Sequence, residues 1–199
     1  MLQVKKIIGK LLSSNMYLLY EDGIADCWLI DIGDFFALSE ALPNGMNVKG
    51  VFLTHSHFDH MAGINELCRM FPHCKVFTSE YGKESLYSEK KNFSFYHEQP
   101  VAYKGENVTV LHDDEVIDIF EEVPLHAIAT PGHCPSCLSY YTDNVIFTGD
   151  SFIPNVLMVT KLPKGNRALA AESTAKILKL AETRIIMAGH DKDKWKSPF

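Results

Sequence analysis

The chain alternates short runs of apolar, β-type residues with turn residues through most of its length. The runs over 16–20 and 27–30 flank the turn Glu21-Asp22-Gly23, which is typical of a β-hairpin. An apolar run over 48–54 predicts a buried strand. The same kind of pattern predicts further strands over 107–111, 116–120, 125–130, 137–141, 144–148 and 184–187.

Helical patterns lie between the groups of strands. They cover residues 35–42, which Pro43-Asn44-Gly45 ends, residues 63–71, and residues 167–182, which space their apolar side chains like an amphipathic helix. Clusters of strands interleaved with helices predict a layered α/β fold. Neither a fixed repeat nor a Gly/Ser linker interrupts the pattern, so we expect one domain over 1–199.

The least regular stretch is 80–122. Its aromatic residues, which stand among charged ones, are expected to pack, to line the mouth of a site or to form a contact between two copies of the chain in a homodimer. They are Tyr81, Tyr87, Phe93, Phe95, Tyr96 and Tyr103.

Composition narrows the classes of partner. With 46% hydrophobic and 22% charged residues among 199, the chain is typical of soluble globular proteins. Its formal net charge of −6 argues against nucleic acid as a partner.

The sequence also argues against a membrane segment. Lys10 and Ser13-Ser14 interrupt the N-terminal apolar stretch, and no apolar run approaches the ~20 residues of a membrane span. We therefore expect a cytoplasmic protein with no membrane partner, and five unevenly spaced cysteines fit reduced thiols there.

Four of the apolar runs end in a polar turn that supplies a histidine or an aspartate. The run over 51–54 leads to His55, and the run over 127–130 leads through Pro131-Gly132 to His133. The runs over 145–148 and 184–187 lead through glycine to Asp150 and His190. Strand ends of this kind can bring side chains from distant parts of a chain to one site.

The segment His55-Ser56-His57-Phe58-Asp59-His60 holds the greatest density of potential ligands. In an extended segment residues two apart face the same way, so His55 and His57 can bind one ion, and a turn after Phe58 directs Asp59 and His60 to a neighbouring ion. Imidazole and carboxylate ligands suit zinc, and also iron or manganese. The predicted metal ligands are His55, His57, Asp59, His60, His133, Asp150 and His190. The remaining histidines, which lie outside any such cluster, are expected to be surface or core residues; they are His73, His97, His112 and His126.

These motifs resemble the metallo-β-lactamase superfamily. The resemblance is carried by His55-x-His57-x-Asp59-His60, Thr130-Pro131-Gly132-His133, Thr148-Gly149-Asp150 and Ala188-Gly189-His190. Position 150 is an aspartate, where classical β-lactamases carry a thiol ligand. In this respect the chain resembles the glyoxalase II, lactonase and general metal-hydrolase branch of the superfamily. The resemblance implies a four-layer αββα sandwich of two mixed β-sheets flanked by helices. It also implies that His55, His57 and His133 hold a first metal, that Asp59, His60 and His190 hold a second, and that Asp150 bridges both.

A dinuclear centre of this kind implies a hydrolase of small molecules. Two divalent ions, with zinc as the first expectation, lower the pKa of a shared water toward about 7 and polarise a carbonyl group. Asp59 is the expected catalytic residue, because it can orient the water and pass a proton to the leaving group. We expect a thioester, lactone or ester as the substrate. Two alternatives remain open: a mononuclear iron enzyme resembling persulfide dioxygenases, which would use His55, His57 or His133 together with Asp150, and a phosphodiesterase on the same dinuclear centre.

Two further groups of residues lie close to these ligands in the sequence. Lys161, Lys164 and Arg167 follow Asp150 and are expected either to bind a carboxylate or phosphate of the substrate or to lie on a solvated loop. Cys134-Pro135-Ser136-Cys137 follows His133 directly, where the superfamily usually shows threonine, proline, glycine and serine. Its two thiols either pack as small side chains or form a disulfide that shifts His133.

Overall fold

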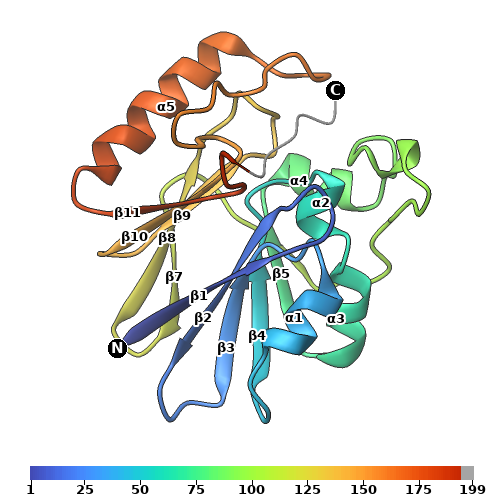
Figure 1. Ribbon diagram of the computed structural model, residues 1–199, viewed down its shortest axis with the longest axis vertical. Coiled ribbons are helices and arrows are strands. Elements are labelled where there is room, and N and C mark those ends of the chain that lie inside the picture. The colour runs from blue at the N-terminus through green and yellow to red at the C-terminus, as the bar shows by residue number, and fades with distance from the viewer. Residues whose placement is uncertain (194–199) are drawn as a thin grey trace.

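The structure is a computed structural model that describes residues 1–193 of the chain. In this part of the chain two mixed β-sheets lie face to face (Figure 1), and helices lie outside them on both sides. The predicted four-layer αββα sandwich is therefore confirmed. The prediction that residues 1–199 form one domain stays a prediction.

The first sheet has the strand order β1-β2-β3-β4-β5-β6. Strands β1, β2 and β3 pair antiparallel, and β3 to β6 pair parallel. The predicted hairpin is the β2–β3 pair, and the predicted buried strand is β4. The strands are β1 (Leu2–Ile8), β2 (Asn15–Glu21), β3 (Asp26–Ile30), β4 (Asn47–Phe52), β5 (Lys75–Thr78) and β6 (Val108–Val110).

The second sheet has the order β11-β10-β9-β8-β7. Its neighbours pair antiparallel except for β10 and β11, which are parallel. All five strands lie within two residues of the predicted ranges. They are β7 (Glu115–Phe120), β8 (Val123–Ala129), β9 (Leu138–Tyr141), β10 (Val145–Gly149) and β11 (Ile185–Ala188).

Helices form the outer layers. Three of them begin at residues whose side chains accept hydrogen bonds from the first helical turn: Asp34 for α1, Ser79 for α4 and Asn166 for α5. None of the helices in the described residues is long and apolar enough to cross a membrane. The helices are α1 (Phe35–Ala41), α2 (Phe58–Met61), α3 (Ile64–Met70), α4 (Glu80–Leu86) and α5 (Arg167–Ala181), with a 3-10 turn, η1, at Ser94–Tyr96.

The central strands of the first sheet are buried on both faces. Leu18 and Leu19 are neighbours in β2, point to opposite faces and are both fully buried. Leu18 belongs to the core between this sheet and the helices, whereas Leu19 belongs to the core between the two sheets, where Phe52 and Phe147 also lie. Burial on both faces explains why the central strands read as unbroken apolar runs rather than as alternating ones.

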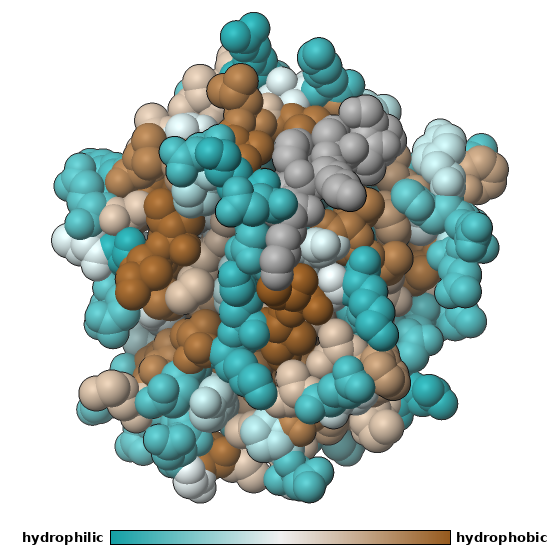
Figure 2. Space-filling model, in the orientation of Figure 1, coloured by the Kyte–Doolittle hydropathy of each residue, from teal (hydrophilic) through white to brown (hydrophobic). Residues whose placement is uncertain are grey.

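The sequence pattern did not predict β1, β5 or α4. Strand β1 lies at the edge of its sheet, and its residues, two lysines among them, are mostly half-buried or exposed, so it lacks a clear apolar face. Figure 2 shows hydrophilic and hydrophobic residues interspersed on the face that carries this edge. Strand β5 spans only four residues, which is too short for a periodic pattern to stand out.

Candidate metal centre

The seven predicted ligands lie together where strand ends of both sheets meet. Strand β4 of the first sheet leads to His55, and β8, β10 and β11 of the second lead to His133, Asp150 and His190. All seven side chains are buried. Their donor atoms form three groups, and within each group the atoms lie no more than 4.8 Å apart: His55, His57 and His133; His55, His60 and Asp150; Asp59, His60 and His190.

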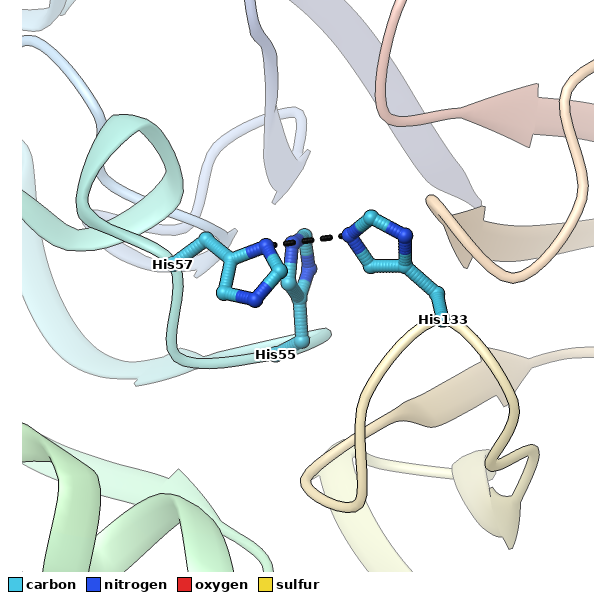
Figure 3. Close-up of side chains that lie close together, drawn as sticks. All are labelled: His55, His57 and His133. Carbon is cyan, nitrogen blue, oxygen red and sulfur yellow. Dashed lines mark hydrogen bonds between the residues drawn. The ribbon is translucent and has the colours of Figure 1, made fainter. Parts of the chain in front are cut away.

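The first group consists of three imidazoles that face one another (Figure 3). Nε2 of His133 lies 3.0 Å from Nδ1 of His57. The ring centroid of His55 lies 4.6 Å from that of His57 and 5.1 Å from that of His133. This arrangement could supply three nitrogen ligands to one ion.

The group of Asp59, His60 and His190, which we call the second group, combines a carboxylate with two imidazoles. Nε2 of His190 lies 3.2 Å from Nε2 of His60 and 3.3 Å from Oδ2 of Asp59. Helix α2, which begins directly after His57, places Asp59 and His60 in its first turn. The turn predicted after Phe58 is therefore the start of a helix. It places Asp59 and His60 beside His190, with the ring centroid of His60 4.2 Å from that of His55.

Asp150 lies between the two groups. Its Oδ1 is 3.5 Å from Nε2 of His60 and 3.6 Å from Nε2 of His190. Its Oδ2 is 3.7 Å from Nε2 of His133. One carboxylate thus presents an oxygen to each group, which is the arrangement that a bridging ligand requires.

Within residues 1–193, three polar atoms of the seven side chains are buried without a hydrogen-bond partner. They are Nε2 of His55, Oδ1 of Asp150 and Nδ1 of His190. Such an atom costs roughly 1–3 kcal/mol unless something satisfies it, and a bound ion is a common explanation. The donor set of imidazoles and carboxylates fits zinc, iron or manganese.

The charges of the centre also suit cations. Burial and the neighbouring imidazoles lower the pKa of His55 well below its usual range, so its ring is neutral and can act as a ligand. Burial alone would lower the pKa of His60, but Asp59, Asp31 and Asp150 raise it to about 10. The carboxylates that favour a proton on His60 equally favour a metal cation in its place, with release of the proton on binding.

Asp31, which directly follows β3, contacts the candidate centre and was not predicted from the sequence. Its carboxylate accepts hydrogen bonds from the backbone N–H and hydroxyl of Thr54, both at 2.7 Å, and from Nδ1 of His60 at 2.9 Å. The last bond keeps a proton on Nδ1 of His60 and directs Nε2 into the centre, so Nε2 is the atom that loses its proton when a metal binds. A signal was present, because Asp31 ends an apolar run just as Asp150 does.

Two further contacts hold ligand-bearing segments in place. Nδ1 of His133 donates a hydrogen bond to the carbonyl oxygen of Val159 at 2.8 Å. This bond leaves Nε2 as the ring nitrogen that can bind a metal. The hydroxyl of Ser14 donates to the carbonyl oxygen of Asp59 at 2.6 Å. The loop between β1 and β2 therefore supports the start of α2.

Comparison with known proteins agrees with this geometry. The family model of the metallo-β-lactamase superfamily matches residues 9–190. The chain belongs to this superfamily. The chain is 30% identical to glyoxylase B2 of Dictyostelium discoideum over 74% of its own length and 51% of that protein. It is 28% identical to hydroxyacylglutathione hydrolase of Enterobacter sp. (strain 638) over 83% of its length and 57% of that enzyme.

The chain thus spans little more than half the length of these curated relatives. It is also similar to the crystal structure of BLEG-1 B3 metallo-β-lactamase, with a TM-score of 0.86 and 27% identity, over 94% of this chain and 91% of that one. The resemblance that the sequence motifs indicated is confirmed by these matches.

Two glycines let this superfamily member bring its ligand segments close together. Gly149 has a φ of +50°, and an added Cβ there would collide with the side chain of Thr54. A Cβ on Gly189 would collide with Oδ1 of Asp150 and would lie 2.9 Å from Cε1 of His60. Only glycine allows the backbone after β11 to pass this close to the centre.

The predicted substrate residues do not share one cavity. Lys161 and Arg167 line a groove of about 1170 Å³ together with Phe93, Tyr96 and Val159. Lys164 instead lines a smaller cavity of about 200 Å³, whose other lining residues include His57, Phe93, Tyr81, Lys90, Lys91 and Cys134. The ring centroid of Phe93 lies 4.9 Å from that of His57. Phe93 therefore lines both cavities, and of these two the smaller one includes a predicted ligand, His57. A role of the aromatic residues in a homodimer stays a prediction.

Proposed function

We propose that this protein is a hydrolase that uses two divalent metal ions, zinc first among them, against the carbonyl carbon of a small-molecule thioester, lactone or ester. The observation that carries the proposal is the position of Asp150, whose two oxygens face two separate groups of ligands. A relative named hydroxyacylglutathione hydrolase supports a thioester as the first substrate to test.

Each ion has a proposed set of ligands. His55, His57 and His133 would hold the first ion, and Asp59, His60 and His190 would hold the second. Asp150 would serve as the shared ligand. When bound, the pair of ions supplies a hydroxide from water at neutral pH and a polarised substrate carbonyl.

The protein contributes orientation and proton transfer. Asp59 is buried at the side of His60 and His190, where its carboxylate orients the attacking water and passes a proton to the leaving group. Asp31 and the carbonyl of Val159 fix the rings of His60 and His133. The burial of the whole centre strengthens each of these electrostatic interactions, because little water is present to screen them.

A substrate panel tests the proposal. Purified protein loaded with zinc would be assayed against a thioester, a lactone, an aryl ester and a bis-aryl phosphodiester, each with and without a chelator. We expect chelator-sensitive hydrolysis of at least one carbonyl substrate. Hydrolysis of the phosphodiester alone would establish the phosphodiesterase instead, and oxygen-dependent turnover with a single iron would establish the mononuclear alternative.

Lys164 has an expected effect on substrate preference. It lies on the cavity beside His57, where its ammonium can bind an anionic group of the substrate. We expect Lys164→Ala to raise KM about tenfold for an anionic thioester, which corresponds to the ~1.4 kcal/mol of one charge-assisted contact. The KM for a neutral thioester should stay the same. Lys83→Ala removes an exposed lysine outside the lining of this cavity and should leave both values unchanged; an equal effect of both variants would contradict the assignment.

Lys161 and Arg167 have a different proposed role. Both line the larger groove, which Val159 connects to His133. They are proposed to bind a more distant anionic part of a longer substrate. A loss of the preference for long over short acyl donors in a Lys161→Ala, Arg167→Ala double variant would support this role, and an unchanged preference would remove it.

A further inference from the structure

We propose that Cys134 and Cys137 form a redox-active dithiol that exchanges with small anionic disulfides at the edge of the candidate metal centre. The two residues occupy the first and fourth positions of the turn Cys134-Pro135-Ser136-Cys137. Their sulfur atoms lie 3.4 Å apart, and both side chains are buried. Because a disulfide bond is about 2.05 Å long, the sulfurs need to approach by only about 1.4 Å.

The surroundings assign a different role to each sulfur. Cys134 lines the cavity of about 200 Å³ that also borders His57, whereas Cys137 is not among the lining residues. A reagent in this cavity therefore reaches Cys134 first. Cys137 lies behind it and can react only with a sulfur already attached there.

The charge of the cavity indicates the class of reagent. Lys90, Lys91 and Lys164 line it. Lys91 forms an ion pair with Glu84 at 2.6 Å. Lys90 and Lys164 instead lie over aromatic rings, which carry no net charge and therefore do not neutralise the two ammonium groups. A disulfide that carries carboxylates fits this cavity better than a neutral or cationic one.

The exchange proceeds in two balanced steps. The Cys134 thiol gives up its proton, and its sulfur attacks one sulfur of the small disulfide, which forms a mixed disulfide and expels a thiolate that takes up the proton. The Cys137 thiol then gives up its proton and attacks Sγ of Cys134, which forms the internal disulfide and expels the second small thiol. Two protein thiols are thereby oxidised, and one small disulfide is reduced to two thiols.

Oxidation here would act on the metal centre. Sγ of Cys134 lies 3.0 Å from Oγ of Ser136, which accepts a hydrogen bond from the backbone N–H of Ser56 at 3.1 Å. Ser56 stands between His55 and His57, and Cys134 directly follows His133. Drawing Sγ of Cys134 toward Cys137 therefore disturbs the support of both segments that carry the first three imidazoles. We expect metal affinity to fall about tenfold or more, the scale of damage to groups that support metal ligands.

The coupling must also act in the opposite direction. If oxidation weakens metal binding by a given factor, metal binding favours the dithiol over the disulfide by the same factor. A ring closed by only four residues gains little stability from the loss of chain entropy. The disulfide is therefore a reversible modification rather than a structural cross-link.

Mass spectrometry tests the exchange on the full chain with its metal removed. The probe is 3,3′-dithiodipropionate, an anionic disulfide. Wild-type protein should lose two hydrogen atoms and yield a peptide linked through Cys134 and Cys137. Cys137→Ser should stop at a mixed disulfide on Cys134, and Cys134→Ser should leave Cys137 unmodified. Cys68→Ser, which changes a thiol outside this turn, should react like wild type.

Three results would overturn the proposal or one of its parts. If neither the linked peptide in wild type nor the adduct in Cys137→Ser formed, the proposed exchange at Cys134 and Cys137 would be overturned. Faster reaction with the cationic disulfide cystamine would overturn the choice of anionic reagents. Equal zinc affinity of the reduced and oxidised protein, measured by competition with a chromogenic chelator, would overturn the coupling to the metal centre.

Discussion

Asp150→Ala should lower hydrolysis by about 10²–10³-fold, the scale seen when a group that stabilises a transition state electrostatically is removed. The physical reason is that the two oxygens of Asp150 face different groups of ligands, with one oxygen 3.7 Å from Nε2 of His133 and the other 3.5 Å from Nε2 of His60. Its loss should also reduce the metal content below two ions per chain. Steady-state rates on the best substrate of the panel and metal analysis of the same sample would measure both effects.

The control for this variant is His73→Ala. His73 is exposed and belongs to none of the three groups of potential ligands, so its loss should change neither the rate nor the metal content. An Asp150→Ala protein that keeps two ions and more than about a tenth of wild-type activity would show that Asp150 does not bridge.

Asp31→Asn should weaken metal binding about 10–100-fold although Asp31 is not a proposed ligand. The asparagine oxygen can still accept the hydrogen bond from the backbone of Thr54, but the amide NH₂ then faces Nδ1 of His60, where the carboxylate had accepted a hydrogen bond. His60 would have to become the acceptor, which places its proton on Nε2 and blocks the atom that faces the centre. Zinc competition titrations would measure the change in affinity.

An exposed aspartate provides the comparison for this second prediction. Asp118 lies on the surface of β7, and Asp118→Asn should bind zinc as wild type does. If Asp31→Asn also bound zinc with unchanged affinity, the ring orientation of His60 would not depend on Asp31.

The clustering of the seven predicted ligands was predictable because its signals are local. His55, His133, Asp150 and His190 each follow an apolar run directly or after a short turn, and the strands that precede them were found in nearly the predicted places. The hairpin of β2 and β3 was predicted for the same reason. A cytoplasmic location stays a prediction, since nothing in the fold bears on it.

The missed features depend on contacts between distant segments. Asp31 ends a strand like the predicted ligands, but its role follows from the approach of His60, which is 29 residues away. Lys161 and Lys164 are only three residues apart, and yet the path of the loop places them on different cavities. The link from Cys134 through Ser136 to Ser56 likewise joins segments about 80 residues apart. No periodic pattern along the chain records such contacts.

Metal stoichiometry is the most direct test of the proposed dinuclear centre. The protein would be stripped with a chelator, reloaded with excess zinc, freed of unbound metal and analysed by inductively coupled plasma mass spectrometry. The proposal predicts close to two zinc ions per wild-type chain, together with the recovery of hydrolytic activity. A folded protein that retains no zinc, or that reaches full activity with a single ion per chain, would contradict it.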